Sequence, residues 1–351
     1  MSGDGHDAGD RGALGQRLIE LVNGYQISAA IGAIARLGVA DALAGGPADL
    51  NALASRLGAD ARSLDRVVRL LTDVGLFERL DDGRVGLTAL GELLREGVPG
   101  SARRGALVVS EEWHWRAYGH LVHSVQSGEP GFRQAHGCGF WDYLEQHPEA
   151  GTLINESMAA ASSFIASALV RSHEFGSLQR VVDVGGGLGT LMRAVLDANP
   201  RAEGVVLDLP GVIGGTRARL EQWGLADRCR AVAGDFLEAV PTGGDAYVLS
   251  WILHDFDDDA AVRILSNCRR AMVDSGRLLA IELVAADDRR QLPPAFEWLV
   301  RTTDIEMLAV VGGRERTVAE YGELYAKAGL ELARVVPLQP SAWSLMEGAP
   351  V

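Results

Sequence analysis

His254 is the side chain in this sequence best placed to act as a general base. It is the only histidine in the second half of the chain, and it follows an apolar stretch, residues 246–253, that reads as a buried strand. Histidine titrates near neutral pH, and the end of a strand brings it to where a ligand can bind. Glu282 ends a later predicted strand, and Glu315 lies in a Gly-Gly-Arg-Glu-Arg-Thr segment. Either carboxylate could fix the tautomer of the histidine and stabilise its cation.

A glycine-rich turn is the second candidate for chemistry. Residues 181–184 read as a buried strand, glycines occupy positions 185, 186, 187 and 189, and a helix is expected from 188 to 199. Such a turn exposes N–H groups at a positive helix end and lets the backbone approach a ligand closely. The dinucleotide fingerprint needs Gly-x-Gly-x-x-Gly, and here the third glycine comes one residue early. Asp183, just before the turn, would repel a pyrophosphate and suits a cationic ligand.

Two further strand ends carry groups that suit a nucleoside. Asp208 lies about twenty residues past the turn, where a carboxylate can accept both hydroxyls of a ribose. Asp235 and Phe236 close the next strand. An acceptor beside an aromatic face suits an adenine, whose amine donates while its ring stacks. Phe236 alone would indicate core packing, but three acidic strand ends in order make chance a poor explanation.

The elements that must position these residues alternate between strand and helix. Strands are expected at 205–208, 229–233, 246–253 and 277–283, and helices at 216–223 and 258–272. This alternation predicts an α/β fold with a doubly wound parallel sheet. Ligands bind at the carboxyl ends of the strands in such sheets, and the polar residues above lie at those ends.

The N-terminal region predicts a helical domain with a two-stranded wing. Apolar residues recur at helical spacing over 18–37, Asp49 can cap a helix that ends at Gly58, and a further helix is expected over 61–74. Residues 76–88 read as a hairpin with an Asp-Gly turn. A winged helix invites a DNA-binding interpretation, but acidic residues on the last helix and the wing make a poor DNA reader. We therefore expect the apolar helical stretch to pair with a second subunit.

Residues 113–147 are unusually aromatic and hold five of the eight histidines. Packing explains such a stretch wherever two domains meet, and the functional interpretation is a pocket wall for a flat, apolar substrate. His120 and His123 share a helix face, but without a nearby carboxylate they are weak indications of a metal site. A further helix is expected over 148–170.

Composition excludes several function classes. The chain has 351 residues, 47% of them hydrophobic and 23% charged, and its net charge of −14 disfavours nucleic-acid and anionic-membrane partners. The polar start does not read as a signal peptide, and no apolar run approaches the roughly 20 residues that span a bilayer, so we expect a cytoplasmic protein. The single lysine, Lys327, is far from the glycine turn, which excludes Schiff-base and Walker A chemistry there. The three dispersed cysteines indicate structural thiols.

Taken together, the motifs resemble those of the small-molecule O-methyltransferases that use S-adenosylmethionine (SAM), including plant caffeate-type and bacterial secondary-metabolite enzymes. They are Asp-Val-Gly-Gly-Gly-x-Gly from 183, Leu-Asp-Leu-Pro at 207–210, Gly-Asp-Phe at 234–236, Trp-Ile-Leu-His-Asp at 251–255 and Gly-Gly-Arg-Glu-Arg-Thr at 312–317. The similarity runs from about Leu18 to the C-terminus. It implies a class I SAM-methyltransferase (Rossmann-like) domain, preceded by a mostly helical, winged-helix-like dimerisation domain, and a homodimer.

The resemblance also implies a division of the chain and a set of site residues. We expect a disordered tail over 1–14, the dimerisation domain over 15–100, a helical linker that contributes to the substrate pocket over 101–175, and the SAM-binding catalytic domain over 176–351. The implied catalytic residues are His254 as base, with Glu282, Glu315 and Asp255. The implied cofactor contacts are Asp183, Gly185, Gly187, Asp208, Leu209, Gly234, Asp235, Phe236, Ser250 and Trp251. The implied acceptor contacts are Trp141, Asn155, Met158, Phe164, Asp304 and Met307.

Two positions depart from the family pattern. Ser250 stands where the plant enzymes carry a lysine, and Phe256 replaces the usual tryptophan after His-Asp. Neither change removes a catalytic group.

The reaction implied is methyl transfer from SAM to a hydroxyl, above all a phenol of an aromatic secondary metabolite. A phenol has an ordinary pKa of about 10, so a base must take its proton as the oxygen attacks the methyl group and S-adenosylhomocysteine leaves. No metal is required. Two alternatives stay open. One is a SAM-binding relative that acts on nitrogen or carbon or catalyses a non-methylating reaction. The other, from a different class, is a SAM-responsive winged-helix DNA-binding regulator.

Overall fold

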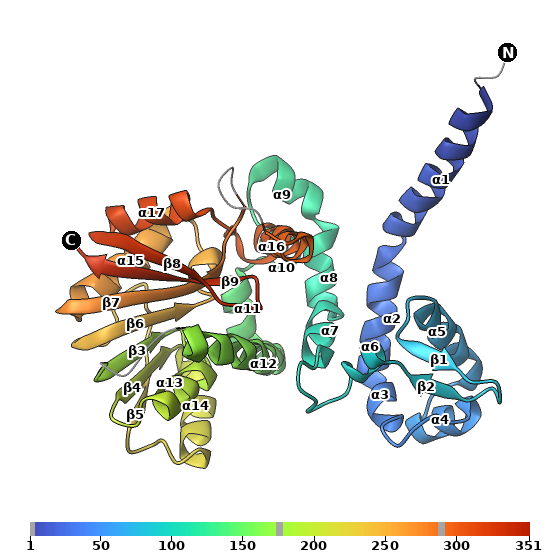
Figure 1. Cartoon of the computed structure of the whole chain (residues 1–351), viewed down its shortest axis with the longest axis horizontal. Helices are drawn as coiled ribbons and strands as arrows, with labels where there is room; N and C mark the ends of the chain where they lie inside the picture. Colours follow the sequence, from blue (N-terminus) through green and yellow to red (C-terminus); the bar gives the residue numbers. More distant parts are fainter. Residues whose placement is uncertain (1–3, 173–177, 287–291) are drawn as a thin grey trace. The chain divides into compact units, whose positions relative to one another are not determined.

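The computed structural model describes residues 4–172, 178–286 and 292–351, and it divides into two compact units, Met1–Glu112 and Trp113–Val351 (Figure 1). The elements of the N-terminal unit are α1 (Asp4–Val22), α2 (Gly24–Leu37), α3 (Val39–Ala42), α4 (Leu50–Leu57), α5 (Ala61–Asp73), β1 (Phe77–Arg79), β2 (Val85–Leu87), α6 (Ala89–Glu92) and α7 (Arg103–Val109).

The N-terminal unit is a helical domain with a two-stranded wing, as the sequence predicts. The side chain of Asp49 accepts the N–H of Ala52 at 3.0 Å and caps α4, and Gly58 ends that helix in the left-handed region with a φ of 65°. β1 and β2 pair in antiparallel fashion and form the predicted hairpin. The core of the unit is a buried apolar cluster that includes Ile34, Leu53, Val68 and Leu71.

The first helical stretch differs from expectation in two ways. The apolar pattern over 18–37 is divided at Asn23 between α1 and α2, and α1 begins at Asp4, inside the stretch expected to be disordered. The side chains from Arg11 to Val22 are exposed, Leu18 and Ile19 among them. This leaves an apolar helix face available for the subunit pairing that the sequence predicts.

The C-terminal unit combines helices with one large sheet. Its helices are α8 (Glu112–Gly119), α9 (Leu121–Ser127), α10 (Gly131–His136), α11 (Phe140–Gln146), α12 (Pro148–Ser172), α13 (Thr190–Ala198), α14 (Pro210–Gln222), α15 (Asp258–Ala271), α16 (Pro294–Glu306) and α17 (Val318–Lys327). A 3₁₀ turn, η1 (Leu253–Asp255), follows β6, and a π-helical turn, η2 (Met307–Val311), follows α16. Its strands are β3 (Arg180–Val184), β4 (Glu203–Asp208), β5 (Cys229–Ala233), β6 (Gly244–Ser250), β7 (Met272–Leu283), β8 (Leu330–Pro337) and β9 (Trp343–Pro350).

The strand order within the described residues is β5-β4-β3-β6-β7-β9-β8. The chain moves outward from β3 to β5 and then returns to place β6 on the other side of β3, so the carboxyl ends of β3 and β6 flank a topological switch point. The expectation of a wholly parallel sheet is wrong at one edge, because β9 runs antiparallel to both β7 and β8. β8 and β9 are joined by the short connection 338–342, which suits an antiparallel hairpin and is too short for a parallel crossover.

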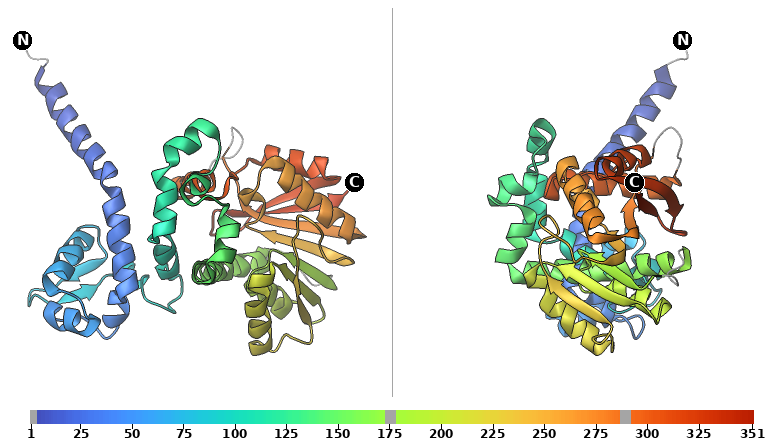
Figure 2. Two further views of the ribbon diagram at one scale, coloured as in Figure 1. Left: turned by 180° about the vertical axis from the view of Figure 1, so that it is seen from behind. Right: turned by 90° about the vertical axis from the view of Figure 1, so that its left-hand side faces the viewer.

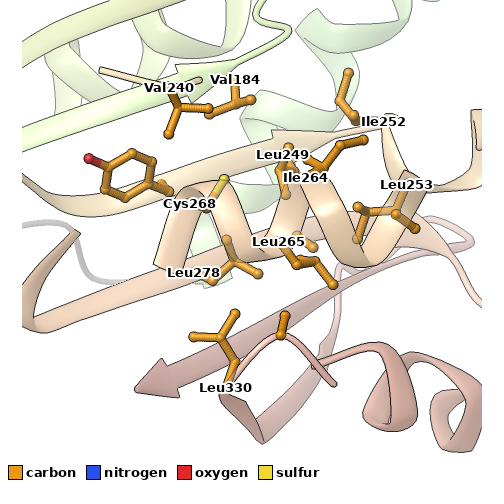
Figure 3. Packing of buried hydrophobic residues seen from close by; sticks show 14 of the residues in the cluster. Val184, Val240, Leu249, Ile252, Leu253, Ile264, Leu265, Cys268, Leu278 and Leu330 are labelled. Atoms are coloured by element: carbon orange, nitrogen blue, oxygen red, sulfur yellow. The ribbon is translucent and has the colours of Figure 1, made fainter. Parts of the chain in front are cut away.

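Helices cover both faces of this sheet (Figure 1 and Figure 2). α12, α13 and α14 pack on one face, and α15 and α17 pack on the other. Figure 3 shows α15 contributing Ile264, Leu265 and Cys268 to the second of these cores, together with Leu253 from the start of η1. The turn that carries His254 is therefore anchored in the core through a fully buried neighbour.

Two helical stretches of the described chain, Arg11–Leu37 and Pro148–Ser172, are long and apolar enough to cross a membrane by length and composition alone. The expectation that no apolar run reaches such a length is therefore wrong as stated. The second stretch places Ile165 and Leu169 in the core beside α13, and core helices of soluble proteins pass the same test.

Candidate active site

The glycine turn follows β3 at the switch point of the sheet. Gly185, Gly187 and Gly189 have φ angles of 71°, 56° and 78°, in the left-handed region that favours glycine. A Cβ added to Gly185 would lie 2.5 Å from Cδ1 of Ile252, whereas one added to Gly187 would meet nothing within 4 Å. The turn thus needs glycine for its shape, and at Gly187 the backbone is open to an approaching ligand.

Asp208, at the end of β4, supports this turn. Its Oδ2 accepts the N–H of Gly187 and its Oδ1 accepts the N–H of Leu209, both at 2.7 Å. Burial raises the pKa of this carboxyl, and the two N–H groups act in the opposite direction. Because an ionised carboxylate offers about four lone-pair sites, each oxygen keeps capacity for a ribose hydroxyl.

The end of β5 carries Gly234, Asp235 and Phe236. Asp235 is exposed, and its Oδ1 accepts the N–H of Leu237 at 2.8 Å. The half-buried ring of Phe236 meets Phe256 edge to face, with ring centroids 5.7 Å apart. Phe256, in the position of the usual tryptophan, therefore still supplies an aromatic wall.

We call the turn 185–189 with Asp208, Asp235 and Phe236 the adenosine side. It combines an open glycine backbone, two carboxylates and an aromatic face at neighbouring strand ends. These are the groups that a ribose and an adenine require, so the residues present fit the nucleoside of SAM.

Asp183, at the end of β3, is buried at the glycine turn. It is 1% exposed and lies beneath the turn, where a Cβ on Gly186 would come within 2.6 Å of its Oδ2. Burial, together with the charge of Asp208, raises the pKa of Asp183 to about 7. Its Oδ2 is buried without a hydrogen-bond partner among the described residues, and its predicted contact with the cofactor stays a prediction.

His254 is held between two carboxylates. Its Nδ1 lies 2.8 Å from Oε1 of Glu315, its Nε2 lies 3.4 Å from Oδ1 of Asp255, and its side chain is 5% exposed. Burial alone would lower the pKa of His254, but Asp255 and Glu315 outweigh that effect and raise it to about 10. The imidazole is therefore a strong base with a fixed orientation.

The two glutamates predicted to flank the histidine act at different places. Glu315 contacts the ring, whereas Oε1 of the fully buried Glu282 accepts the N–H groups of Ile252 at 3.1 Å and Leu253 at 2.8 Å. Burial raises the pKa of Glu282 to about 7, although the nearby His254 acts to lower it. Glu282 fixes the backbone that carries the base. We call His254, Asp255, Glu282 and Glu315 the acid–base side.

Trp251 lies beside the base. It has a φ of 57°, which is strained for a residue with a side chain. Its ring stacks on the imidazole of His254, with ring centroids 5.9 Å apart and an angle of 27° between the ring planes. Its ring centroid also lies 5.3 Å from that of Trp343 in β9. Trp343 in turn meets Phe164 of α12 at 6.0 Å. The structure thus places Trp251, a predicted cofactor contact, next to His254. Ring contacts through Trp343 also connect Phe164, a predicted acceptor contact, to Trp251.

The other predicted acceptor contacts come from several elements. Asp304 accepts the N–H of Glu315 through Oδ1 at 2.8 Å, and the buried Met307 begins η2. Asn155 and Met158 lie on α12, half-buried and exposed respectively, and the exposed Trp141 packs on Phe140. Asp304 is therefore tied to the acid–base side through the backbone of Glu315.

The aromatic stretch 113–147 packs mainly on itself. Trp113, Phe132 and Phe140 are buried and in ring contact with one another. Nearby, His114 Nε2 lies 2.9 Å from Glu306, and the Tyr118 hydroxyl donates to the same carboxylate at 2.5 Å. The rings of this stretch thus form a packed core. The contacts of His114 and Tyr118 with Glu306 also connect α8 to the end of α16, and the sequence did not predict that connection.

Three residues near the base received no role from the sequence. Gly313 and Arg316 lie inside the Gly-Gly-Arg-Glu-Arg-Thr motif, so the motif itself was the available signal, whereas Trp343 lies beyond the last predicted strand. In the described part of the chain, no three histidine, cysteine or acidic side chains gather as a metal would require. That catalysis needs no metal stays a prediction.

The surface of α5 is poorly suited to DNA. Asp65 pairs with Arg69 at 3.1 Å and also with Arg79 from the wing, so part of the positive charge on this face is offset. Phosphate binding would have to compete with these ion pairs.

Comparison with known proteins gives two family matches. The model of the O-methyltransferase domain matches residues 118–331, and that of the O-methyltransferase dimerisation domain matches residues 19–97. The phenazine O-methyltransferase of Lysobacter antibioticus is 39% identical over 335 residues, which cover 95% of this chain and 96% of that protein. The phenazine-1-carboxylate N-methyltransferase of Pseudomonas aeruginosa is 36% identical, with 93% and 95% covered.

Solved structures are similar over nearly the whole chain. The mitomycin 7-O-methyltransferase superposes with a TM-score of 0.90 at 36% identity, covering 98% of this chain and all of that one. An O-methyltransferase from neocarzinostatin biosynthesis, solved with SAM and 2-hydroxy-5-methyl naphthoic acid, has a TM-score of 0.78 at 35% identity, with 92% and 96% covered.

Proposed function

Because this chain belongs to the SAM-dependent O-methyltransferases, we propose that it methylates a phenolic oxygen of an aromatic acceptor and that His254 is the general base. The main support for this proposal is the buried pair of His254, which follows β6, and Glu315. Nδ1 of the histidine lies 2.8 Å from Oε1 of the glutamate. Nδ1 is hydrogen-bonded to Glu315, whereas Nε2 makes only a 3.4 Å contact with Asp255, so Nε2 is the atom that would accept a proton from the acceptor.

The adenosine side would hold the cofactor through the glycine turn, Asp208, Asp235 and Phe236. Bound SAM supplies an electrophilic methyl group on a positively charged sulfur. The protein's part is to align the acceptor oxygen and to remove its proton at Nε2 of His254. Glu315 stabilises the imidazolium that forms, and burial of the pair keeps bulk water away from it.

The test is the substitution His254→Ala. We expect turnover to fall by roughly 10²–10⁴-fold, the usual contribution of a positioned base, while SAM affinity measured by calorimetry is unchanged. His147→Ala, which alters an exposed histidine on another element, is the matched control and should keep full turnover. A His254→Ala protein that turns over phenols at the wild-type rate would overturn the assignment.

Methyl transfer to nitrogen is the second candidate, because one relative at 36% identity is an N-methyltransferase. A neutral amine already has a free lone pair and needs no base before it attacks. An aromatic acceptor that carries both a hydroxyl and an amine separates the two functions when the product is identified by NMR. O-methylation should disappear in His254→Ala, whereas N-methylation should persist.

We also infer that the protein acts as a homodimer. The match to a dimerisation domain and the exposed apolar residues Leu18, Leu21, Val22 and Tyr25 support this assembly. Light scattering of the intact chain tests it.

A further inference from the structure

Arg316 is a fully buried arginine directly behind the turn that carries His254. Its Nη1 donates to the carbonyl of Leu253 at 2.8 Å, and its Nη2 donates to the carbonyl of Phe256 at 2.7 Å. These two carbonyls bracket His254 and Asp255 in the chain. A buried guanidinium is stable only when its charge and its donors are met. Asp258 meets the charge, accepting from Nε at 3.0 Å and from Nη2 at 2.8 Å.

The residues before Arg316 also lie against the same turn. The N–H of Arg314 donates to the carbonyl of His254 at 2.9 Å, and Glu315 contacts the imidazole itself. A Cβ added to Gly313 would lie 1.9 Å from the carbonyl oxygen of His254. The segment 313–316 therefore approaches the turn so closely that its first residue must be glycine.

This segment is fixed on its other side to the sheet and to a helix. Arg316 forms a bridge with Val284, just past β7, and its carbonyl accepts the N–H of Ala285 at 2.9 Å. The N–H of Glu315 donates to Asp304 of α16. The carbonyl groups of the turn thus accept hydrogen bonds from Arg314 and Arg316. Its N–H groups donate to Glu282.

We propose that Arg316 is a positioning residue for the base, and that the segment 313–316 forms a clamp that sets the distance between His254 and Glu315. This inference rests on the proposed function, because it concerns how His254 is held for proton transfer. The planar fork of arginine can reach two carbonyls and Asp258 at fixed angles, whereas a lysine ammonium on a flexible stem cannot serve all three.

Arg316→Lys is the central test, since it keeps the positive charge and loses the fork. We expect kcat to fall by roughly 10²-fold, because a displacement of about 1 Å at a reacting group has that effect, while SAM affinity is unchanged. Arg277→Lys is the control, because Arg277 pairs with Glu347 between β7 and β9 and should retain full activity. A purely structural role would lower the melting temperature and leave kcat of the folded fraction unchanged.

The second readout does not depend on turnover. The imidazole of His254 is titrated by NMR in the cofactor-free protein, with His254→Ala used to assign its signal. The groups that face it are Asp255, Glu282 and Glu315, with Arg316 behind the turn and Tyr321 of α17 behind the two glutamates. If the clamp sets the His254–Glu315 distance, Arg316→Lys lowers the pKa of the imidazole, and Arg277→Lys does not.

Gly313→Ala tests the clamp by displacing its backbone, and it replaces Arg316→Lys if that variant does not fold. Its Cβ forces the segment away from the carbonyl of His254, so kcat and the imidazole pKa should both fall. If His254→Ala is inactive but both clamp variants keep the wild-type kcat and titration, the clamp is refuted and the base stands. If His254→Ala is itself fully active, the proposed function fails first.

Discussion

The adenosine side and the acid–base side occupy the same edge of one sheet, and they are built from different parts of the chain. The adenosine side lies at the ends of β3, β4 and β5 and consists largely of backbone, together with side chains that are exposed or half-buried. The acid–base side lies at the ends of β6 and β7 and in the segment after η2, and its side chains are buried except for the half-buried Asp255. His254 and Glu315, its central pair, are 61 residues apart in sequence.

This difference predicts different sensitivities. On the adenosine side the backbone conformation of the glycines determines the shape of the turn. Most side-chain substitutions there should therefore change the affinity for SAM without affecting the acid–base side. On the acid–base side, burial and then the charge of Glu315 raise the pKa values of Asp255 and Glu282, because little solvent is left to screen that charge. The two pKa values are raised to about 6 and about 7, respectively.

Glu315→Gln should have the largest effect. The substitution preserves size but removes the charge that stabilises the imidazolium. We expect kcat to fall by roughly 10³-fold, less than the roughly 10⁴-fold that loss of the orienting carboxylate costs in a catalytic triad, because Asp255 remains beside the ring. SAM affinity should not change. Steady-state kinetics and calorimetry on the same preparation measure both quantities.

The pH dependence of the same variant gives an independent check. The raised pKa of His254 means that its neutral, proton-accepting form increases as pH rises from 7 toward about 10, so wild-type kcat should rise across that window. Without the charge of Glu315 the pKa of His254 falls, and the rise should be complete at lower pH. An unchanged profile would mean that Glu315 does not govern the base.

Gly185→Ala should produce the converse result, with a loss of affinity and an intact base. A left-handed conformation costs an L-residue roughly 1–2 kcal/mol, and overpacking against Ile252 adds a further roughly 1–3 kcal/mol. The turn relieves this strain by moving, so we expect SAM to bind roughly 10²-fold more weakly. At saturating SAM, kcat should remain close to wild type.

Gly214→Ala is the matched control for that experiment. Gly214 lies within α14, and a Cβ there would meet nothing within 4 Å. Alanine favours a helix over glycine, so the control should bind SAM normally. If both variants lose affinity equally, the conformation of Gly185 is not what shapes the adenosine side.

The residues of the adenosine side could be picked out from the sequence because their signals are local, and their contacts with the cofactor stay predictions. Glycines at a strand end, an acidic residue at the end of the next strand and an Asp-Phe pair at the third are each readable within a few residues. The parallel strands β3 to β7 followed from the same alternation. Asp183 shows the limit of such reasoning, because the sequence placed its carboxylate at the turn but could not show that it is almost fully buried there.

The acid–base side could be predicted only in part, because its contacts join distant segments. His254 was recognised from its position, but two glutamates were equal candidates for the ring, and only the packing of 313–316 against η1 distinguishes them. Trp251 was predicted as a cofactor contact from the family resemblance, and that contact stays a prediction; its ring contact with His254 was not predicted. β9 was not predicted, and it supplies Trp343.

Asp235 tests whether side chains on the adenosine side act directly or by shaping the backbone. Its Oδ1 already accepts the N–H of Leu237, and its second oxygen is available to an adenine amine. Asp235→Ala removes both functions, while Asp235→Asn keeps an oxygen for Leu237 and presents an amide to the adenine. We expect both variants to bind SAM about tenfold more weakly, the value of one hydrogen bond, with kcat at saturation unchanged. If Asp235→Asn instead binds SAM with wild-type affinity, the side chain at 235 acts only by accepting the N–H of Leu237. It then shapes the backbone of the adenosine side and does not contact the adenine.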